Sequence, residues 1–172
     1  MVSMPAVIVI TGASGAGKTT LTRAIGSLEL PGVACFQCDS IYYELPDEVR
    51  SDGEAAQDAI LKYWLKHVLA EPAIKTAILE TQIRPHKAKR VLRVFGIEVH
   101  QIVLVECEHF EREARLVGPR GQPELASPQM ENWAAYLRGQ ADAMELAIID
   151  TSKAPMSSSL ARLREIVESL VE

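Results

Sequence analysis

The sequence is 172 residues long, with 48% apolar residues, 24% charged residues and a formal net charge of −5. This length and composition are typical of one soluble globular domain with a substantial core. The acidic balance argues against a nucleic-acid partner, because such proteins normally present a basic face. No apolar stretch reaches the about 18 residues of a membrane span, and the N-terminus lacks the basic region of a signal peptide. We therefore expect a cytoplasmic protein that contacts no membrane.

Short apolar runs rich in Val and Ile alternate with helical patterns along the chain. The predicted strands are Ala6–Ile10, Val33–Gln37, Ala77–Glu80, Val99–Val105 and Ala147–Asp150. The predicted helices are Lys18–Leu28, Glu54–Leu69, Pro85–Phe95, Glu108–Val117, Pro128–Met144 and Ser159–Val171. Apolar strands separated by helices predict a parallel sheet covered on both faces. We therefore expect an α/β fold with a five-stranded parallel sheet, in a single domain over residues 1–172.

A loop of small residues follows the first predicted strand. It reads Gly12-Ala13-Ser14-Gly15-Ala16-Gly17-Lys18-Thr19, followed by Thr20. The loop matches the phosphate-binding pattern G-x-x-x-x-G-K-[ST], placed between a strand and a helix as that pattern requires. Its glycines let backbone N–H groups turn towards phosphate, and the helix N-terminus adds positive charge. Lys18 is expected to reach the β- and γ-phosphates, and Thr19 to bind Mg²⁺. The sequence therefore predicts the P-loop NTPase fold, with a site for a nucleoside triphosphate and Mg²⁺.

Two acidic residues occur where predicted strands end. Asp39 follows the second strand, and it lies near the glycine loop if that strand neighbours the first. Its carboxylate could accept the proton of an acceptor hydroxyl or orient Mg²⁺. It could instead cap the helix or turn that follows. Glu80 closes the third strand, as in the Walker B strand whose acid positions Mg²⁺ or the attacking group.

Arg84 lies four residues after Glu80, in the stretch "ETQIRP". This acid-plus-Arg spacing resembles the Asp-Gly-Phe-Pro-Arg segment of nucleoside-monophosphate kinases, without the Gly-Phe-Pro centre. The stretch "DSIYY", Asp39 to Tyr43, is similar to the Asp-Ser-Phe-Tyr of uridine kinases. The resemblance implies that Arg84 grips an anionic acceptor or the transferring phosphoryl group. The alternative is a surface arginine at the start of a helix.

The stretch "CEHFEREARLVGPRGQPEL" resembles the lid of small P-loop kinases. In those enzymes a helix with spaced arginines runs into a segment that closes over the phosphates. The resemblance implies that Arg115 and Arg120 face the phosphates, with Arg138 a weaker candidate. Helical spacing also lets Arg112 or Arg115 pair with an acidic residue of the same helix.

Taken together, these segments resemble the P-loop small-molecule kinases, a group that includes shikimate, gluconate, antibiotic and nucleoside-monophosphate kinases. The resemblance implies an ATP- and Mg²⁺-dependent phosphotransferase that acts on a small-molecule acceptor. Residues 39–75 would form the acceptor-binding region, and residues 112–128 a short lid. The alternative is a regulatory P-loop module that binds or hydrolyses ATP without a metabolite acceptor. The acceptor, its attacking group (hydroxyl or phosphate), the choice of ATP or GTP and the oligomeric state stay open.

Overall fold

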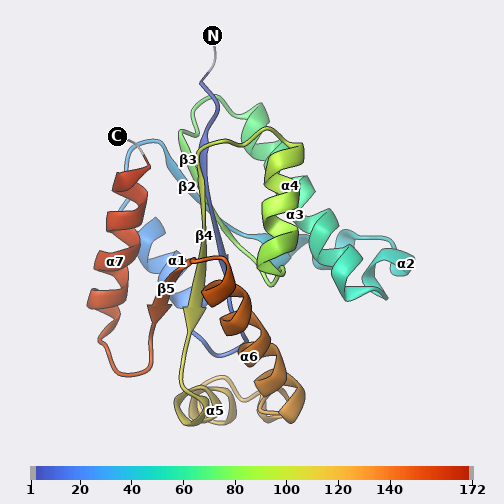
Figure 1. Ribbon diagram of the computed structural model, residues 1–172, viewed down its shortest axis with the longest axis vertical. Helices are drawn as coiled ribbons and strands as arrows, with labels where there is room; N and C mark the ends of the chain where they lie inside the picture. Colours follow the sequence, from blue (N-terminus) through green and yellow to red (C-terminus); the bar gives the residue numbers. More distant parts are fainter. Residues whose placement is uncertain (1–2, 171–172) are drawn as a thin grey trace.

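The computed structural model describes residues 3–170 and contains one five-stranded sheet (Figure 1). Its strands are β1 (Ala6–Thr11), β2 (Val33–Gln37), β3 (Thr76–Glu80), β4 (His100–Glu106) and β5 (Ala147–Asp150). The strands lie in the order β2-β3-β1-β4-β5, and every neighbouring pair is parallel. The predicted α/β fold with a five-stranded parallel sheet is therefore confirmed.

Helices cover both faces of this sheet, as predicted. The longer ones are α1 (Lys18–Gly26), α3 (Gly53–Ala70), α4 (Pro85–Val94), α5 (His109–Val117), α6 (Pro128–Ala143) and α7 (Met156–Ser169). Helices α1 and α7 pack on one face, whereas α3, α4 and α6 pack on the other (Figure 1). Val171, the predicted end of the last helix, lies outside the described residues. Among the helices of residues 3–170, none has the length and apolar character needed to cross a membrane.

Strand β1 is buried along its whole length, because it lies at the centre of the sheet and is covered on both sides. Ile8 and Ile10 pack into the core beneath α1 and α7. Val7 and Val9 point to the opposite face and pack into the core beneath α3 and α4. Successive side chains of a strand alternate between faces, so a strand buried on both sides needs an unbroken apolar run.

The second strand does not neighbour the first, because β3 lies between them. The condition under which Asp39 was expected to approach the glycine loop is therefore not met. The parallel register nevertheless aligns Gln37 of β2 with Glu80 of β3, and Glu80 with Ile10 of β1. The three strands thus end at one edge of the sheet, and the segments that follow them start there.

The stretch from Asp39 to Glu54, which has an irregular sequence, contains two short helices. A 3₁₀ helix, η1, spans Cys38–Glu44, and a single-turn helix, α2, spans Asp47–Arg50. Single turns show no apolar periodicity, so the sequence pattern could not predict them. The other irregular stretch, between α5 and α6, contains only the short 3₁₀ helix η2 (Pro123–Leu125).

The close approach of Gly12 to strand β4 provides a test of this arrangement. A Cβ atom at Gly12 would lie 2.2 Å from the backbone carbonyl oxygen of Val105. Because the backbone of β4 cannot rotate away, Gly12→Ala should lower the free energy of unfolding by about 1–3 kcal/mol. Gly139→Ala in α6 is the matched control, since open space surrounds Gly139 and helical Ala is favoured by about 1 kcal/mol. Urea unfolding measures both, and an undiminished stability of Gly12→Ala would contradict the close approach.

Candidate active site

The glycine loop joins β1 to α1, so the predicted nucleotide-binding residues, Gly12 to Thr20, lie in this loop and in the first turn of α1. Gly15 and Gly17 adopt φ values of 82° and 101°, in the left-handed region that favours glycine. Lys18 opens α1, and its Nζ donates hydrogen bonds to the carbonyl oxygens of Gly12 (2.7 Å) and Ala13 (3.1 Å). The ammonium group therefore lies over the loop, where the pattern G-x-x-x-x-G-K-[ST] would place phosphates.

Lys18 is only 8% exposed, and this burial changes the protonation equilibrium of its side-chain amine. Desolvation lowers the pKa of Lys18 to about 8, since a buried ammonium loses its hydration. The nearby carboxylates of Glu80 and Asp39 raise the pKa and partly oppose this effect, whereas Arg120 lowers it further. Three predicted site residues from separate segments thus lie close enough to Lys18 to influence its charge.

Thr19 and Glu80, the predicted Mg²⁺ ligands, contact each other directly. Thr19 Oγ1 donates a hydrogen bond of 2.7 Å to Glu80 Oε1. Glu80 is 9% exposed, and its second oxygen, Oε2, is buried without a hydrogen-bond partner among residues 3–170. A buried carboxylate oxygen without a donor is costly unless a cation or water reaches it. Because hydroxyl and carboxylate oxygens are the ligands that Mg²⁺ prefers, this pair fits the ion.

A cavity of about 220 Å³, which we call the inner cavity, connects Asp39 with the glycine loop. Its charged and hydroxyl lining residues are Ser14, Lys18, Thr19, Asp39, Ser40, Glu80 and Arg120. The half-buried Asp39 accepts hydrogen bonds from Gln57 Nε2 (3.2 Å) and Gln82 Nε2 (2.8 Å). These bonds come from side-chain amides rather than from backbone N–H groups, so Asp39 does not act as a helix cap.

Gln57 and Gln82 were not predicted from the sequence. Gln57 lies in the second turn of α3, where a glutamine belongs to no motif. Gln82 follows Glu80 by two residues, so it lies at the carboxyl edge of the parallel sheet, where such folds bind ligands. This position was the one feature of the sequence that could have indicated a role in the site. In the structure the two residues also contact each other, because the Gln82 backbone N–H donates to the side-chain oxygen Oε1 of Gln57 (3.2 Å).

The arginines of the predicted lid occupy different environments. Arg112 is buried, donates to the carbonyl oxygen of Cys107 (2.9 Å) and pairs with Glu131 of α6. Its acidic partner therefore lies on another helix. Arg120 is exposed and lines both the inner cavity and a cavity of about 460 Å³ over the glycine loop, which we call the loop cavity.

Arg115 also lines the loop cavity, but its guanidinium group is held by the protein. It donates to the Thr151 carbonyl oxygen (2.7 Å), the Thr151 hydroxyl (3.0 Å) and the carbonyl oxygen of Gly15 (3.3 Å). The buried Thr151 hydroxyl donates in turn to the carbonyl oxygen of Ala16 (2.6 Å). Thr151, which was not predicted from the sequence, thus links α5 to the glycine loop.

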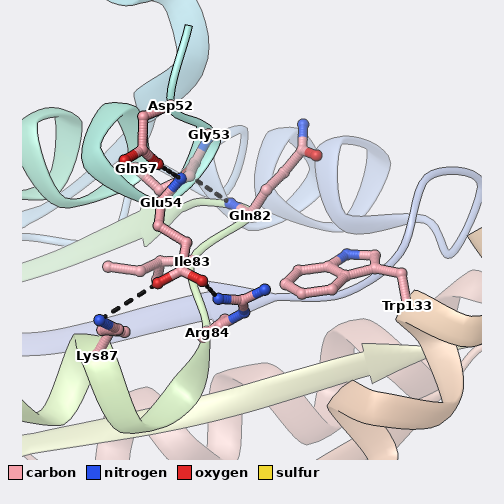
Figure 2. Close-up of a pocket in the computed structure, with 9 residues that line it drawn as sticks. All are labelled: Asp52, Gly53, Glu54, Gln57, Gln82, Ile83, Arg84, Lys87 and Trp133. Carbon is pink, nitrogen blue, oxygen red and sulfur yellow. Dashed lines mark hydrogen bonds and ion pairs between the residues drawn. The ribbon is translucent and has the colours of Figure 1, made fainter. Parts of the chain in front are cut away.

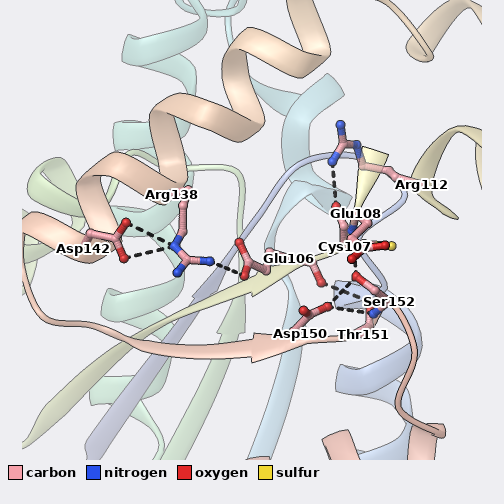
Figure 3. A network of polar contacts seen from close by, with 9 residues as sticks. All are labelled: Glu106, Cys107, Glu108, Arg112, Arg138, Asp142, Asp150, Thr151 and Ser152. Carbon is pink, nitrogen blue, oxygen red and sulfur yellow. Dashed lines mark hydrogen bonds and ion pairs between the residues drawn. The ribbon is translucent and has the colours of Figure 1, made fainter. Parts of the chain in front are cut away.

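Polar contacts also join the loop after β5 to the start of α5 (Figure 3). The backbone N–H of Glu108 donates to Ser152 Oγ (2.7 Å), and Ser152 Oγ donates to Asp150 (2.5 Å). The hydrogen bond from Ser152 lowers the pKa of Asp150. Burial raises the pKa of Glu106, which pairs with Arg138 (2.6 Å). Arg138 is therefore paired with an acidic residue of the protein. The N-terminal end of α5 is held against the loop that follows β5.

Arg84 lines a third cavity of about 430 Å³, which we call the outer cavity (Figure 2). Its guanidinium pairs with Glu54 at the start of α3 and lies 5.7 Å from the ring centroid of Trp133. Gln82 lines both the outer and the inner cavity, so the two spaces adjoin. The structure thus places Arg84 next to the inner cavity and outside the group of residues that surrounds Lys18.

No protein-family model and no curated protein sequence matches the chain. Solved structures do match it. Shikimate kinase from Acinetobacter baumannii, in complex with shikimate, is 17% identical with a TM-score of 0.59, over 96% of this chain and 94% of that chain. The APS kinase of Mycobacterium tuberculosis, in complex with AMPPNP and APS, is 17% identical with a TM-score of 0.60, over 96% and 98%. A gluconokinase from Sinorhizobium meliloti is 18% identical with a TM-score of 0.60, over 98% and 99%.

These similarities run over nearly the whole length of each chain, and they agree with the glycine loop that follows β1. At such low identity they describe the fold and not a particular reaction. The chain has the fold of the P-loop small-molecule kinases.

Proposed function

We propose that this protein transfers the γ-phosphate of Mg-ATP to a hydroxyl group of a small-molecule acceptor. The inner cavity carries the proposal, because it joins a carboxylate, Asp39, to the phosphate-binding residues Lys18 and Arg120. The similarity to kinases that include an AMPPNP complex supports a nucleotide at the glycine loop. Phosphoryl transfer needs positioned groups and compensation of negative charge more than covalent chemistry, and the cavity provides both.

On the nucleotide side, Lys18 and Arg120 stabilise the negative charge of the moving phosphoryl group. Thr19 and Glu80 hold Mg²⁺, which neutralises charge on the phosphate oxygens when it is bound. Arg115 is fixed by Thr151 and Gly15, so it positions α5 against the glycine loop. Arg120 has no ion-pair partner within residues 3–170. The exposed segment that carries it forms the lid over the phosphates.

On the acceptor side, Asp39 accepts the proton of the attacking hydroxyl. The hydroxyl oxygen then forms a bond to the γ-phosphorus, and the bond from that phosphorus to the bridging oxygen of ADP breaks. The amides of Gln57 and Gln82 fix the orientation of the Asp39 carboxylate. Lys18 and Arg120 are assigned to the phosphates of the nucleotide, so a phosphate as the attacking group would meet the negative charge of Asp39 without a cation of its own. We therefore infer that the attacking group is a hydroxyl.

Replacing Asp39 with Asn tests this role. The variant should bind Mg-ATP within about threefold of the wild type, because its position is on the acceptor side. Its acceptor-dependent ADP release should fall by about 10²-fold or more, since general-base catalysis is worth about 10²–10⁴. Asp47→Asn is the matched control, because Asp47 is an exposed aspartate of α2.

ADP release is measured from Mg-ATP with and without nucleosides, nucleoside monophosphates, sugars, sugar acids and other small alcohols. Equal loss of ATP binding and of transfer in Asp39→Asn would instead place Asp39 in the nucleotide site. Wild-type ADP release that ignores every acceptor would favour a regulatory P-loop module over a phosphotransferase.

The lowered pKa of Lys18 predicts a pH dependence of nucleotide binding. With a pKa of about 8, Lys18 is mostly charged below that pH and mostly neutral above it. Phosphates interact with the ammonium form of Lys18. Above that pH, Lys18 must therefore take up a proton when the protein binds Mg-ATP. The Kd for Mg-ATP should therefore rise with pH above the pKa, by up to about tenfold per pH unit.

Isothermal titration calorimetry in buffers of different ionisation enthalpy measures both the Kd and the proton uptake. Lys18→Arg is the control, because a guanidinium stays charged throughout this range and should show no proton uptake. A wild-type Kd that is the same on both sides of the Lys18 pKa would contradict the prediction.

A further inference from the structure

The charged side chains that line the outer cavity determine whether a charged or an uncharged acceptor can bind there. We propose that the acceptor is an uncharged polyhydroxy compound, and that Glu54 is the residue that discriminates against acids. This inference rests on the proposed function, since it concerns the acceptor of the same reaction. It differs from the expectation that Arg84 grips an anion.

Glu54 holds both cations of the outer cavity (Figure 2). Its carboxylate pairs with Arg84, and its second oxygen lies 3.3 Å from Lys87 Nζ. The side chains of Arg84 and Lys87 are only 33% and 29% exposed, so the ion pairs are partly shielded from water. The groups that would attract an anionic acceptor therefore already share a carboxylate from the protein.

The other side of Arg84 is also occupied. Its guanidinium lies 5.7 Å from the ring centroid of Trp133 and 5.4 Å from that of Tyr136. These two rings of α6 stack on each other, with centroids 5.6 Å apart and an interplanar angle of 15°. The guanidinium of Arg84 is held in the wall of the outer cavity by cation–π contacts on one side and by the ion pair with Glu54 on the other.

The charges of the outer cavity balance. The carboxylates of Asp52 and Glu54 oppose the cations Arg84 and Lys87, and Asp39 adds a negative charge where the inner cavity begins. An anionic acceptor would have to displace Glu54 from its partners and leave that carboxylate unpaired beside its own charge. Such a like-charge arrangement lowers affinity and is a known means of rejecting a wrong ligand.

The remaining lining is uncharged and can form hydrogen bonds. The side chains of Gln57 and Gln82 line the cavity beside Gly53 and Ile83. Each side-chain amide has two N–H groups and an oxygen that can accept two hydrogen bonds, and one N–H of each is used on Asp39. The remaining N–H and oxygen positions suit a molecule with several hydroxyls. The volume of about 430 Å³ lies within the usual range for small-molecule sites. A neutral sugar, cyclitol or nucleoside has these properties.

The experiment compares acceptors in pairs that differ mainly in charge: sorbitol with gluconate, methyl shikimate with shikimate, and uridine with uridine monophosphate. The readout is kcat/KM for acceptor-dependent ADP release from Mg-ATP. For at least one pair, the neutral member should exceed the acid by about tenfold or more, the effect of one unfavourable charge contact. Calorimetric titration of the same compounds into the protein with AMPPNP bound gives their ranking independently of turnover.

Glu54→Gln removes the charge while keeping the shape of the side chain. It should raise kcat/KM for the acid and reduce the neutral-to-acid ratio by about tenfold, because Arg84 and Lys87 then become available. Glu165→Gln is the matched control, since it removes an exposed carboxylate that pairs with Arg162 on α7.

A wild-type preference for the acids, or a ratio that Glu54→Gln leaves unchanged, would overturn this inference and leave phosphotransfer intact. Stimulation by no member of any pair would instead overturn the proposed function, and this inference with it.

Discussion

The candidate site depends on the parallel pairing of the buried strand β1 with β3. Parallel strands end at the same edge of a sheet, so this pairing brings the glycine loop after β1 beside Glu80 at the end of β3. The 2.7 Å hydrogen bond from Thr19 to Glu80 joins residues 61 positions apart in the chain, and it exists because of that register. Strand β2 extends the same edge, so that Asp39 reaches the inner cavity although its strand is not adjacent to β1.

Charge balance links the nucleotide side of the site to the acceptor side. The buried ammonium of Lys18 is costly by itself, and the carboxylates of Glu80 and Asp39 offset part of this cost. Further out, Glu54 pairs with Arg84 and Lys87, and Asp52 adds the second negative charge that balances these two cations. Positive charge is thus available near the glycine loop, where phosphates would bind, and is neutralised by carboxylates where the acceptor would bind. This distribution of charge would suit the proposed pairing of a highly charged nucleotide with an uncharged acceptor.

Much of the fold could be predicted from the sequence, because apolar periodicity reports burial directly. The strand bounds agree with the predictions to within one residue, and the long helices lie where predicted. Strand order could not be predicted, since several orders satisfy the same alternation of strands and helices. The glycine loop is a local motif and was visible, whereas Gln57, Gln82 and Thr151 act through tertiary contacts. Thr151 contacts Ala16 across 135 positions, and no local pattern encodes such a contact.

The fate of the γ-phosphate tests the central claim most directly. Phosphorus NMR would follow Mg-ATP incubated with the protein and a mixture of neutral polyhydroxy compounds. The account predicts that the ATP signals give way to those of ADP and of a new phosphate monoester. Unchanged ATP, or conversion to ADP and inorganic phosphate alone, would contradict it.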